Sequence, residues 1–149
     1  MAEKQYIVFK LNDEKFATNI HHIASITDYA SITSLPNGPA YVDGLLNLRG
    51  DIIPVVNLKK RFKMTDTAAR DKRILIARKE DVLIGFLVDD ASQSMAVDEQ
   101  DILPPPKIAI KKDNAYISEV CIHENELIIV IDFDKILTDD EISEILEIN

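Results

Sequence analysis

Short apolar runs separated by polar turns dominate the chain, and their spacing is that of β-hairpins. Tyr6–Leu11 and Lys15–Ile20 flank a polar turn, a pattern typical of two antiparallel strands. Three more segments of the same form follow: residues 42–58, 73–88 and 116–133. The stretch 33–40 contains Pro36, Gly38 and Pro39 and is predicted to be a loop. The pattern therefore predicts an all-β protein.

The order hairpin, proline loop, hairpin occurs twice. Apolar positions of the first hairpin recur 67 residues later, and those of the second recur 75 residues later. Examples of matched pairs are Ile7/Ile74, Phe9/Ile76, Tyr41/Tyr116, Val55/Val130 and Asn57/Asp132. We interpret this as two similar halves, residues 1–66 and 67–137. Each half suits a small closed β-barrel, and exchange of strands between the halves stays open.

The C-terminal residues change the pattern. Leu127–Ile131 is apolar on both faces, so both faces need a cover, and the other half is the natural one. Thr138–Glu141 then has the form of a capping box, and Ile142, Ile145 and Leu146 follow at helical spacing. This predicts a short helix over residues 138–149 that packs on a barrel.

Composition and charge narrow the function. The chain has 149 residues, 46% of them apolar and 29% charged, which is typical of a soluble globular protein. Its net charge is −9: residues 1–112 carry 16 basic and 15 acidic side chains, and residues 113–149 carry one and 11. Such an acidic end argues against binding to nucleic acid. One basic cluster could meet an acidic protein surface: Arg49, Lys59, Lys60, Arg61 and Lys63.

Catalytic, metal-binding and membrane-spanning patterns are missing. Cys121 and His123 point to the same side of a predicted strand, but a half-buried cysteine beside a surface histidine is favoured over a nucleophilic pair. His21 and His22 are favoured as a surface pair over metal ligands. We expect no cofactor and no metal. Without an apolar run of ~20 residues or an N-terminal signal core, a cytosolic location is expected.

Arg49 is the candidate binding residue that the pattern itself points to. It follows the apolar run Val42–Leu48 and stands in the turn Arg49-Gly50-Asp51, where Gly50 suits the positive φ of a tight turn. A guanidinium at this place offers a rigid fork to a carboxylate or to backbone carbonyls. A solvent-facing turn arginine is the alternative.

Residues 37–62 resemble the central signature of the CheW family of coupling proteins. The signature includes Asn47-Leu-Arg-Gly50 followed by Ile52-Ile-Pro-Val55. Two more blocks agree with the family, residues 86–106 and 127–137. The resemblance implies one CheW-like domain over residues 1–149. Its fold would be all-β, with two small SH3-like β-barrels packed together and a short C-terminal helix.

The resemblance also implies a function. Such a protein is a non-enzymatic adaptor that couples the cytoplasmic tips of chemoreceptors to the histidine kinase CheA in bacterial chemotaxis. It would work in the cytoplasm, at receptor arrays on the inner membrane, without inserting into the membrane or binding nucleic acid. The alternative is a double β-barrel that binds a small ligand or is an enzyme. That function needs a pocket with convergent polar groups, and the sequence names no such set.

Site residues follow from the family's motif. In the family the receptor docks at the junction of the barrels, which implies a receptor-binding role for Ile23, Gly44, Asn47 and Arg49. An apolar contact with the kinase is expected in the second half. Its candidate residues are Val88, Met95 and Ile102. For Met95, filling of a barrel is the competing interpretation.

Several positions depart from the family pattern. These are Ser25, Asn57, Lys59 and Glu119, in places where Glu, Asp, Arg and Gly respectively are frequent. The first departure bears on the receptor contact, and the glutamate bears on a turn of the second half.

Overall fold

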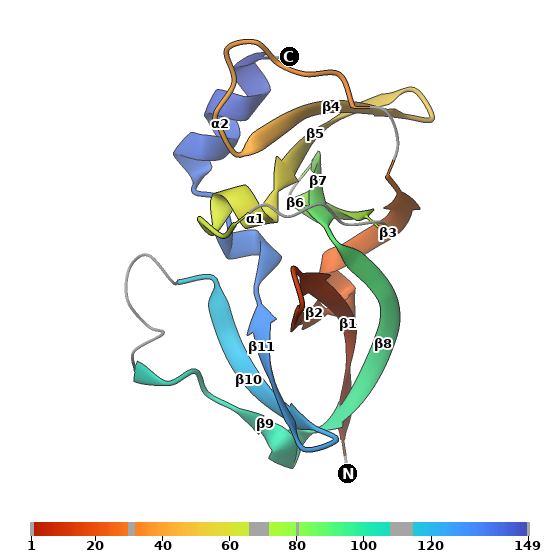
Figure 1. The fold of residues 1–149 in the computed structure, drawn as a ribbon, viewed down its shortest axis with the longest axis vertical. Coiled ribbons are helices and arrows are strands. Elements are labelled where there is room, and N and C mark those ends of the chain that lie inside the picture. Colours follow the sequence, from red (N-terminus) through yellow and green to blue (C-terminus); the bar gives the residue numbers. More distant parts are fainter. Residues whose placement is uncertain (1, 30–31, 66–71, 80, 108–114, 149) are drawn as a thin grey trace.

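The fold consists of two β-sheets stacked along the long axis of the molecule (Figure 1). The computed structural model describes all residues except 1, 30–31, 66–71, 80, 108–114 and 149. The first sheet has the order β8-β1-β2-β11-β10-β9 and the second has the order β3-β6-β7-β5-β4. Helix α2 (Asp139–Ile148) lies beside the second sheet, far from the N-terminus.

The strands are short and mostly antiparallel. Those of the first sheet are β1 (Glu3–Leu11), β2 (Glu14–Asn19), β8 (Asp90–Asp98), β9 (Ile102–Leu103), β10 (Ile117–His123) and β11 (Glu126–Ile131). Those of the second sheet are β3 (Ile23–Asp28), β4 (Val42–Leu48), β5 (Asp51–Asn57), β6 (Arg73–Lys79) and β7 (Val82–Val88). Short helical turns connect them: η1 (Ile20–His22), α1 (Leu58–Arg61), η2 (Glu99–Asp101) and η5 (Phe133–Lys135). The expected all-β class with a short C-terminal helix is confirmed.

Each half of the chain contributes strands to both sheets. The first sheet takes β1 and β2 from residues 1–66 and takes β8 to β11 from residues 67–137. Two parallel pairings, β2 with β11 and β5 with β7, join strands from different halves. The boundary at residue 66 therefore divides the sequence but does not separate the two sheets.

The two sheets repeat the same arrangement, which confirms the duplication. Along each sheet β8, β1, β2, β11 and β10 correspond to β3, β6, β7, β5 and β4. The sixth strand, β9, corresponds to an isolated bridge between Thr33 and Leu45 at the edge of β4. Irregularities recur as well, since β4 and β10 are both shifted at the same place. Low sequence identity between the halves thus conceals a nearly exact structural repeat.

The apolar side chains form three clusters, which explains why several strands are apolar on both faces. On β11, Ile128 and Val130 fill the first barrel, whereas Ile129 and Ile131 pack into the large cluster between the sheets. A third cluster, around Val55, fills the second barrel. Because alternate residues of a strand point to opposite faces, these strands are covered on both sides. The expected cover of 127–131 by the rest of the molecule is confirmed.

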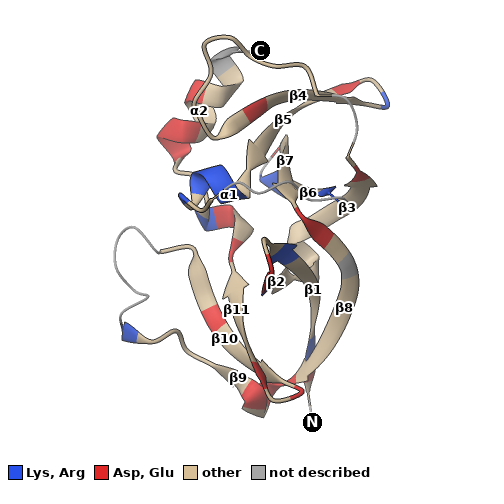
Figure 2. Ribbon diagram, in the orientation of Figure 1, with Lys and Arg blue, Asp and Glu red and all other residues tan. Residues whose placement is uncertain are grey.

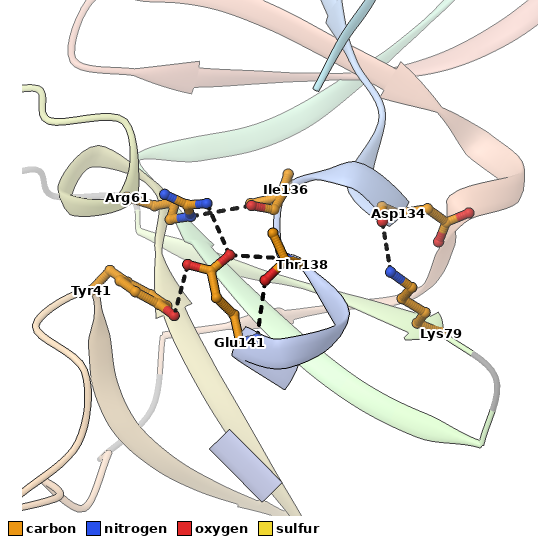
Figure 3. Close-up of polar contacts among 7 residues, drawn as sticks. All are labelled: Tyr41, Arg61, Lys79, Asp134, Ile136, Thr138 and Glu141. Atoms are coloured by element: carbon orange, nitrogen blue, oxygen red, sulfur yellow. Dashed lines mark hydrogen bonds and ion pairs between the residues drawn. The ribbon is translucent and has the colours of Figure 1, made fainter. Parts of the chain in front are cut away.

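Helix α2 begins with the predicted capping box. The backbone N–H of Thr138 donates to Glu141 Oε1 at 2.9 Å, and the N–H of Glu141 donates to Thr138 Oγ1 at 3.1 Å. Ile145 is buried in the cluster between the sheets, and Ile142 packs against that cluster. Figure 3 shows how the same carboxylate meets Arg61 of α1 and Tyr41, which fix the helix on the second sheet.

Candidate functional site

The tip of the β4–β5 hairpin is the most distinctive exposed feature, and it appears as a basic point in Figure 2. Leu48 pairs with Asp51, so the loop has only two residues, Arg49 and Gly50. Their φ angles are +53° and +89°, as a type I′ turn requires. The side chain of Asn47 closes the turn, because its Oδ1 accepts a hydrogen bond from the N–H of Gly50 at 3.2 Å.

Arg49 occupies this turn at a conformational cost. Left-handed φ values suit glycine and asparagine, and a side chain such as arginine is strained there by roughly 1–2 kcal/mol. The side chain is exposed, and within the described part of the chain no hydrogen bond or ion pair to it is seen. The guanidinium is therefore presented to solvent rather than used inside the protein.

An exposed isoleucine lies beside this arginine. Ile52 is 54% exposed and is the cross-strand partner of Asn47. Arg49, Asn47 and Ile52 together form what we call the hairpin-tip surface: one fixed cation, one amide and one apolar side chain. Ile52 was not among the predicted site residues. The apolar run Ile52–Val55 indicated a strand, but it did not indicate which of its residues would be left uncovered.

Gly44 has a structural role below the tip. Its φ is +151°, and an added Cβ would lie 2.1 Å from the carbonyl oxygen of Thr33. That residue crosses the edge of β4 here and exchanges two backbone hydrogen bonds with Leu45, at 2.8 and 2.9 Å. Gly44 is buried, so any part in partner binding is limited to shaping the strand. Ile23 is half-buried at the start of β3, on the opposite edge strand of the sheet.

Two of the three predicted kinase-contact residues are not on the surface. Val88 is 1% exposed and packs in the cluster between the sheets, and Met95 is 5% exposed and fills the first barrel. We correct these two assignments, because a buried side chain cannot form the apolar centre of a contact. The barrel-filling interpretation of Met95 is the right one. Ile102 is half-buried on β9, next to the exposed Leu103.

The predicted basic cluster is mostly neutralised within the protein. Lys60 Nζ lies 3.0 Å from Asp43, and an Arg61 nitrogen lies 3.1 Å from Glu141. Figure 2 shows basic residues on α1 facing acidic residues on α2. The expectation that the cluster meets an acidic partner as a unit is therefore wrong, and Arg49 is its exposed member at the hairpin tip.

A buried ion pair joins the two sheets. Lys59 Nζ lies 2.9 Å from Asp89, and their side chains are only 4% and 7% exposed. Asp89 also accepts a hydrogen bond from the N–H of Asn12 in the β1–β2 turn. The carboxylate thus ties that turn to α1, which follows the second sheet. Lys59 is one of the departures from the family pattern, and the pair shows that lysine fills that position by reaching a buried carboxylate.

The departure at Glu119 is also explained by its contacts. Glu119 accepts a hydrogen bond from the Tyr6 hydroxyl at 3.0 Å and lies 3.5 Å from Lys4 Nζ. Burial, followed by this bond, raises the pKa of the Tyr6 hydroxyl. Burial likewise raises the pKa of the Cys121 thiol, which keeps it protonated and disfavours the nucleophilic pair with His123.

One group has the composition of a metal site. Potential ligand atoms of His22, Asp132 and Asp134 all lie within 4.8 Å of one another, and His22 Nδ1 is 3.5 Å from an Asp132 oxygen. The sequence pattern missed this group because 110 residues separate the histidine from Asp132. Asp132 already caps η5, accepting from the N–H of Asp134. Asp134 is exposed, so the group resembles an ordinary cap with a histidine beside it.

Known proteins of one family match this chain. A family model described as the CheW-like domain matches residues 5–141. Proteins named chemotaxis protein CheW from Bacillus subtilis and Thermotoga maritima are 31% and 30% identical, covering 90% and 97% of this chain and 86% and 94% of theirs. The crystal structure of a scaffolding protein, TtCheW from Thermoanaerobacter tengcongensis, matches with a TM-score of 0.79 at 32% identity. That match covers 88% of this chain and 85% of the other. In the described residues no helix is long and apolar enough to cross a membrane.

Proposed function

The chain belongs to the CheW family, and from this membership we propose that it links chemoreceptors to the histidine kinase CheA. Membership itself makes the protein a non-enzymatic adaptor of chemotaxis signalling with two SH3-like barrels. The identity of its two partners, its place in the cytoplasm at receptor arrays and its contact residues are the proposal. No observation in the described residues favours the enzymatic or small-ligand alternative.

The hairpin-tip surface is the proposed receptor contact. The observation that carries this proposal is Arg49: it is held in a strained turn, it is exposed, and the adjacent Ile52 is also exposed. An apolar side chain supplies contact area, and a fixed guanidinium next to it selects a carboxylate or carbonyl of the partner. Asn47 and Gly44 hold the turn and the strand below it. Ile23 is proposed to contribute from β3.

The kinase contact is proposed on the first sheet, on the short edge strand β9. Ile102 remains from the predicted set, and the exposed Leu103 extends it. An edge strand with exposed apolar side chains is a site where another β domain can pack. This surface belongs to a different sheet from the hairpin tip, so the two partners can bind at the same time.

Binding of the two partners to separate variants tests the proposal. The purified protein is titrated calorimetrically with the C-terminal regulatory domain of CheA and, separately, with a receptor cytoplasmic fragment. Arg49→Glu is expected to remove receptor binding and to keep kinase binding, whereas Leu103→Asp is expected to do the reverse. If wild-type protein binds neither partner, the assignment of partners is wrong. If both variants lose both partners equally, the separation of the two surfaces is wrong.

A further inference from the structure

The duplicated fold contains the same groove twice, once on each sheet. In the first sheet it lies between the start of β2 and β11, and in the second between the start of β7 and β5. Equivalent residues line both: Glu14/Asp81, Phe16/Leu83, Glu126/Asp51, Leu127/Ile52 and Ile129/Pro54. We call them the first-sheet groove and the second-sheet groove. Their shared lining means that what fills one indicates what fits the other.

The second-sheet groove is partly filled by the C-terminal helix. Leu146 of α2 lies in its wall, and the groove has a volume of about 230 Å³. The helix is fixed at this place from its other side, by buried Ile145 and by the ion pair of Glu141 with Arg61 at 3.1 Å. An aliphatic side chain on a short amphipathic helix is therefore the occupant that this groove geometry accepts.

The first-sheet groove lacks such an occupant. Its volume is about 470 Å³, its lining comes from β1–β2 and β11 with no helical residue, and Leu127 at its rim is 68% exposed. Burial of such a leucine contributes favourably to binding in proportion to the apolar area removed from water. The groove is thus an open copy of a site that holds a helix elsewhere in the same chain.

The charge of the rim indicates the chemistry of the partner. Asp13, Glu14 and Glu126 line the groove, and its single base, Lys15, is already 3.3 Å from Glu126. A rim with excess negative charge attracts basic segments and repels acidic ones. Helix α2 of a second copy would be a poor occupant, because its first turn carries three acidic residues and its last turn carries no base.

We propose that the first-sheet groove binds a short amphipathic helix of a partner protein, which inserts a leucine or isoleucine flanked by Lys or Arg. The contact is additional to the hairpin-tip surface and to the proposed kinase surface on β9, and it does not depend on either. It gives the adaptor a third attachment point, on the first sheet, whose occupant is a helix rather than a barrel.

Two synthetic helices test the proposal. One has the sequence of α2, and the other has the same sequence with every acidic residue replaced by lysine; both are stapled to keep them helical. Each is titrated into the ¹⁵N-labelled full chain while amide shifts are followed. The lysine helix is expected to shift amides around Phe16 and Leu127 and to bind at least tenfold more tightly than the α2 helix.

Matched variants locate the binding. Leu127→Asp and Glu126→Lys are expected to weaken binding of the lysine helix by tenfold or more, whereas Ile52→Asp, the equivalent change on the second sheet, leaves it unchanged. Circular dichroism checks that each variant is folded, and Glu126→Lys keeps the test open if Leu127→Asp fails to fold. Three results would overturn the proposal: no shifts at the groove, equal loss with Ile52→Asp, or tighter binding of the α2 helix, which would point to a second copy.

Discussion

Replacing Arg49 by asparagine is expected to make the protein more stable while it removes receptor binding. Arg49 has a φ of +53° in a two-residue turn, and asparagine accepts this conformation more readily than arginine. The arginine side chain is exposed, so its removal leaves no cavity. Relief of the strained turn should therefore determine the sign of the change in stability.

The magnitude follows from the strain. A left-handed residue with an ordinary side chain is destabilised by roughly 1–2 kcal/mol, and asparagine recovers part of this. We expect Arg49→Asn to raise the free energy of unfolding by about 1 kcal/mol, which corresponds to an increase in Tm of about 2–4 °C for a domain of this size. Urea unfolding followed by circular dichroism measures the first quantity, and a thermal melt measures the second.

The equivalent turn of the other sheet supplies a control. Glu124 has a φ of +50° at the tip of the β10–β11 hairpin, where it corresponds to Arg49. Glu124→Asn is expected to give a similar stabilisation but no loss of receptor binding. A lower unfolding free energy for Arg49→Asn would show that the guanidinium stabilises the folded chain, and the reasoning that it is held for a partner would fail.

Three further changes test other parts of the structure. Lys59→Met should lower the unfolding free energy by about 3–5 kcal/mol in urea, because it leaves Asp89 buried without its ion pair, and adding Asp89→Leu should recover most of the loss. Gly44→Ala should destabilise by about 2 kcal/mol or more and speed amide exchange at Leu45, since its Cβ meets a backbone carbonyl; unchanged exchange would contradict this. Burial and Glu141 raise the pKa of Tyr41 from 10.0 to about 12, so above pH 10 the unfolded chain loses this proton first and stability falls as pH rises to about 12. Tyr41→Phe should flatten that alkaline decline.

Local features of the fold were predictable because they depend on residues close together in sequence. The hairpins follow from alternating apolar runs and turns, and the capping box of Thr138 and Glu141 is visible in four residues. The distribution of strands between the sheets was not predictable. It depends on the parallel pairing of β2 with β11, which joins residues more than 100 positions apart, and no periodicity within a strand specifies its distant neighbour.

The candidate site divides in the same way. Arg49 was found because turn geometry is local. Val88 and Met95 were misjudged because strands that are apolar on both faces give no sign of which side reaches the surface. The basic cluster was misjudged for a related reason: the carboxylate that pairs with Arg61 lies 80 residues further along the chain. Partners this distant become visible only when the fold brings them together.

The central claim is that this adaptor couples receptors to the kinase through Arg49. Its most direct test is the rate of CheA autophosphorylation in a reconstituted mixture of receptor-containing vesicles, CheA and this protein. The wild-type protein is expected to raise the rate well above that of the mixture without it. Arg49→Glu is expected to give the rate of the mixture without adaptor, although it still binds the CheA regulatory domain. Full activation by a folded Arg49→Glu protein, or no activation by the wild type, would contradict the account.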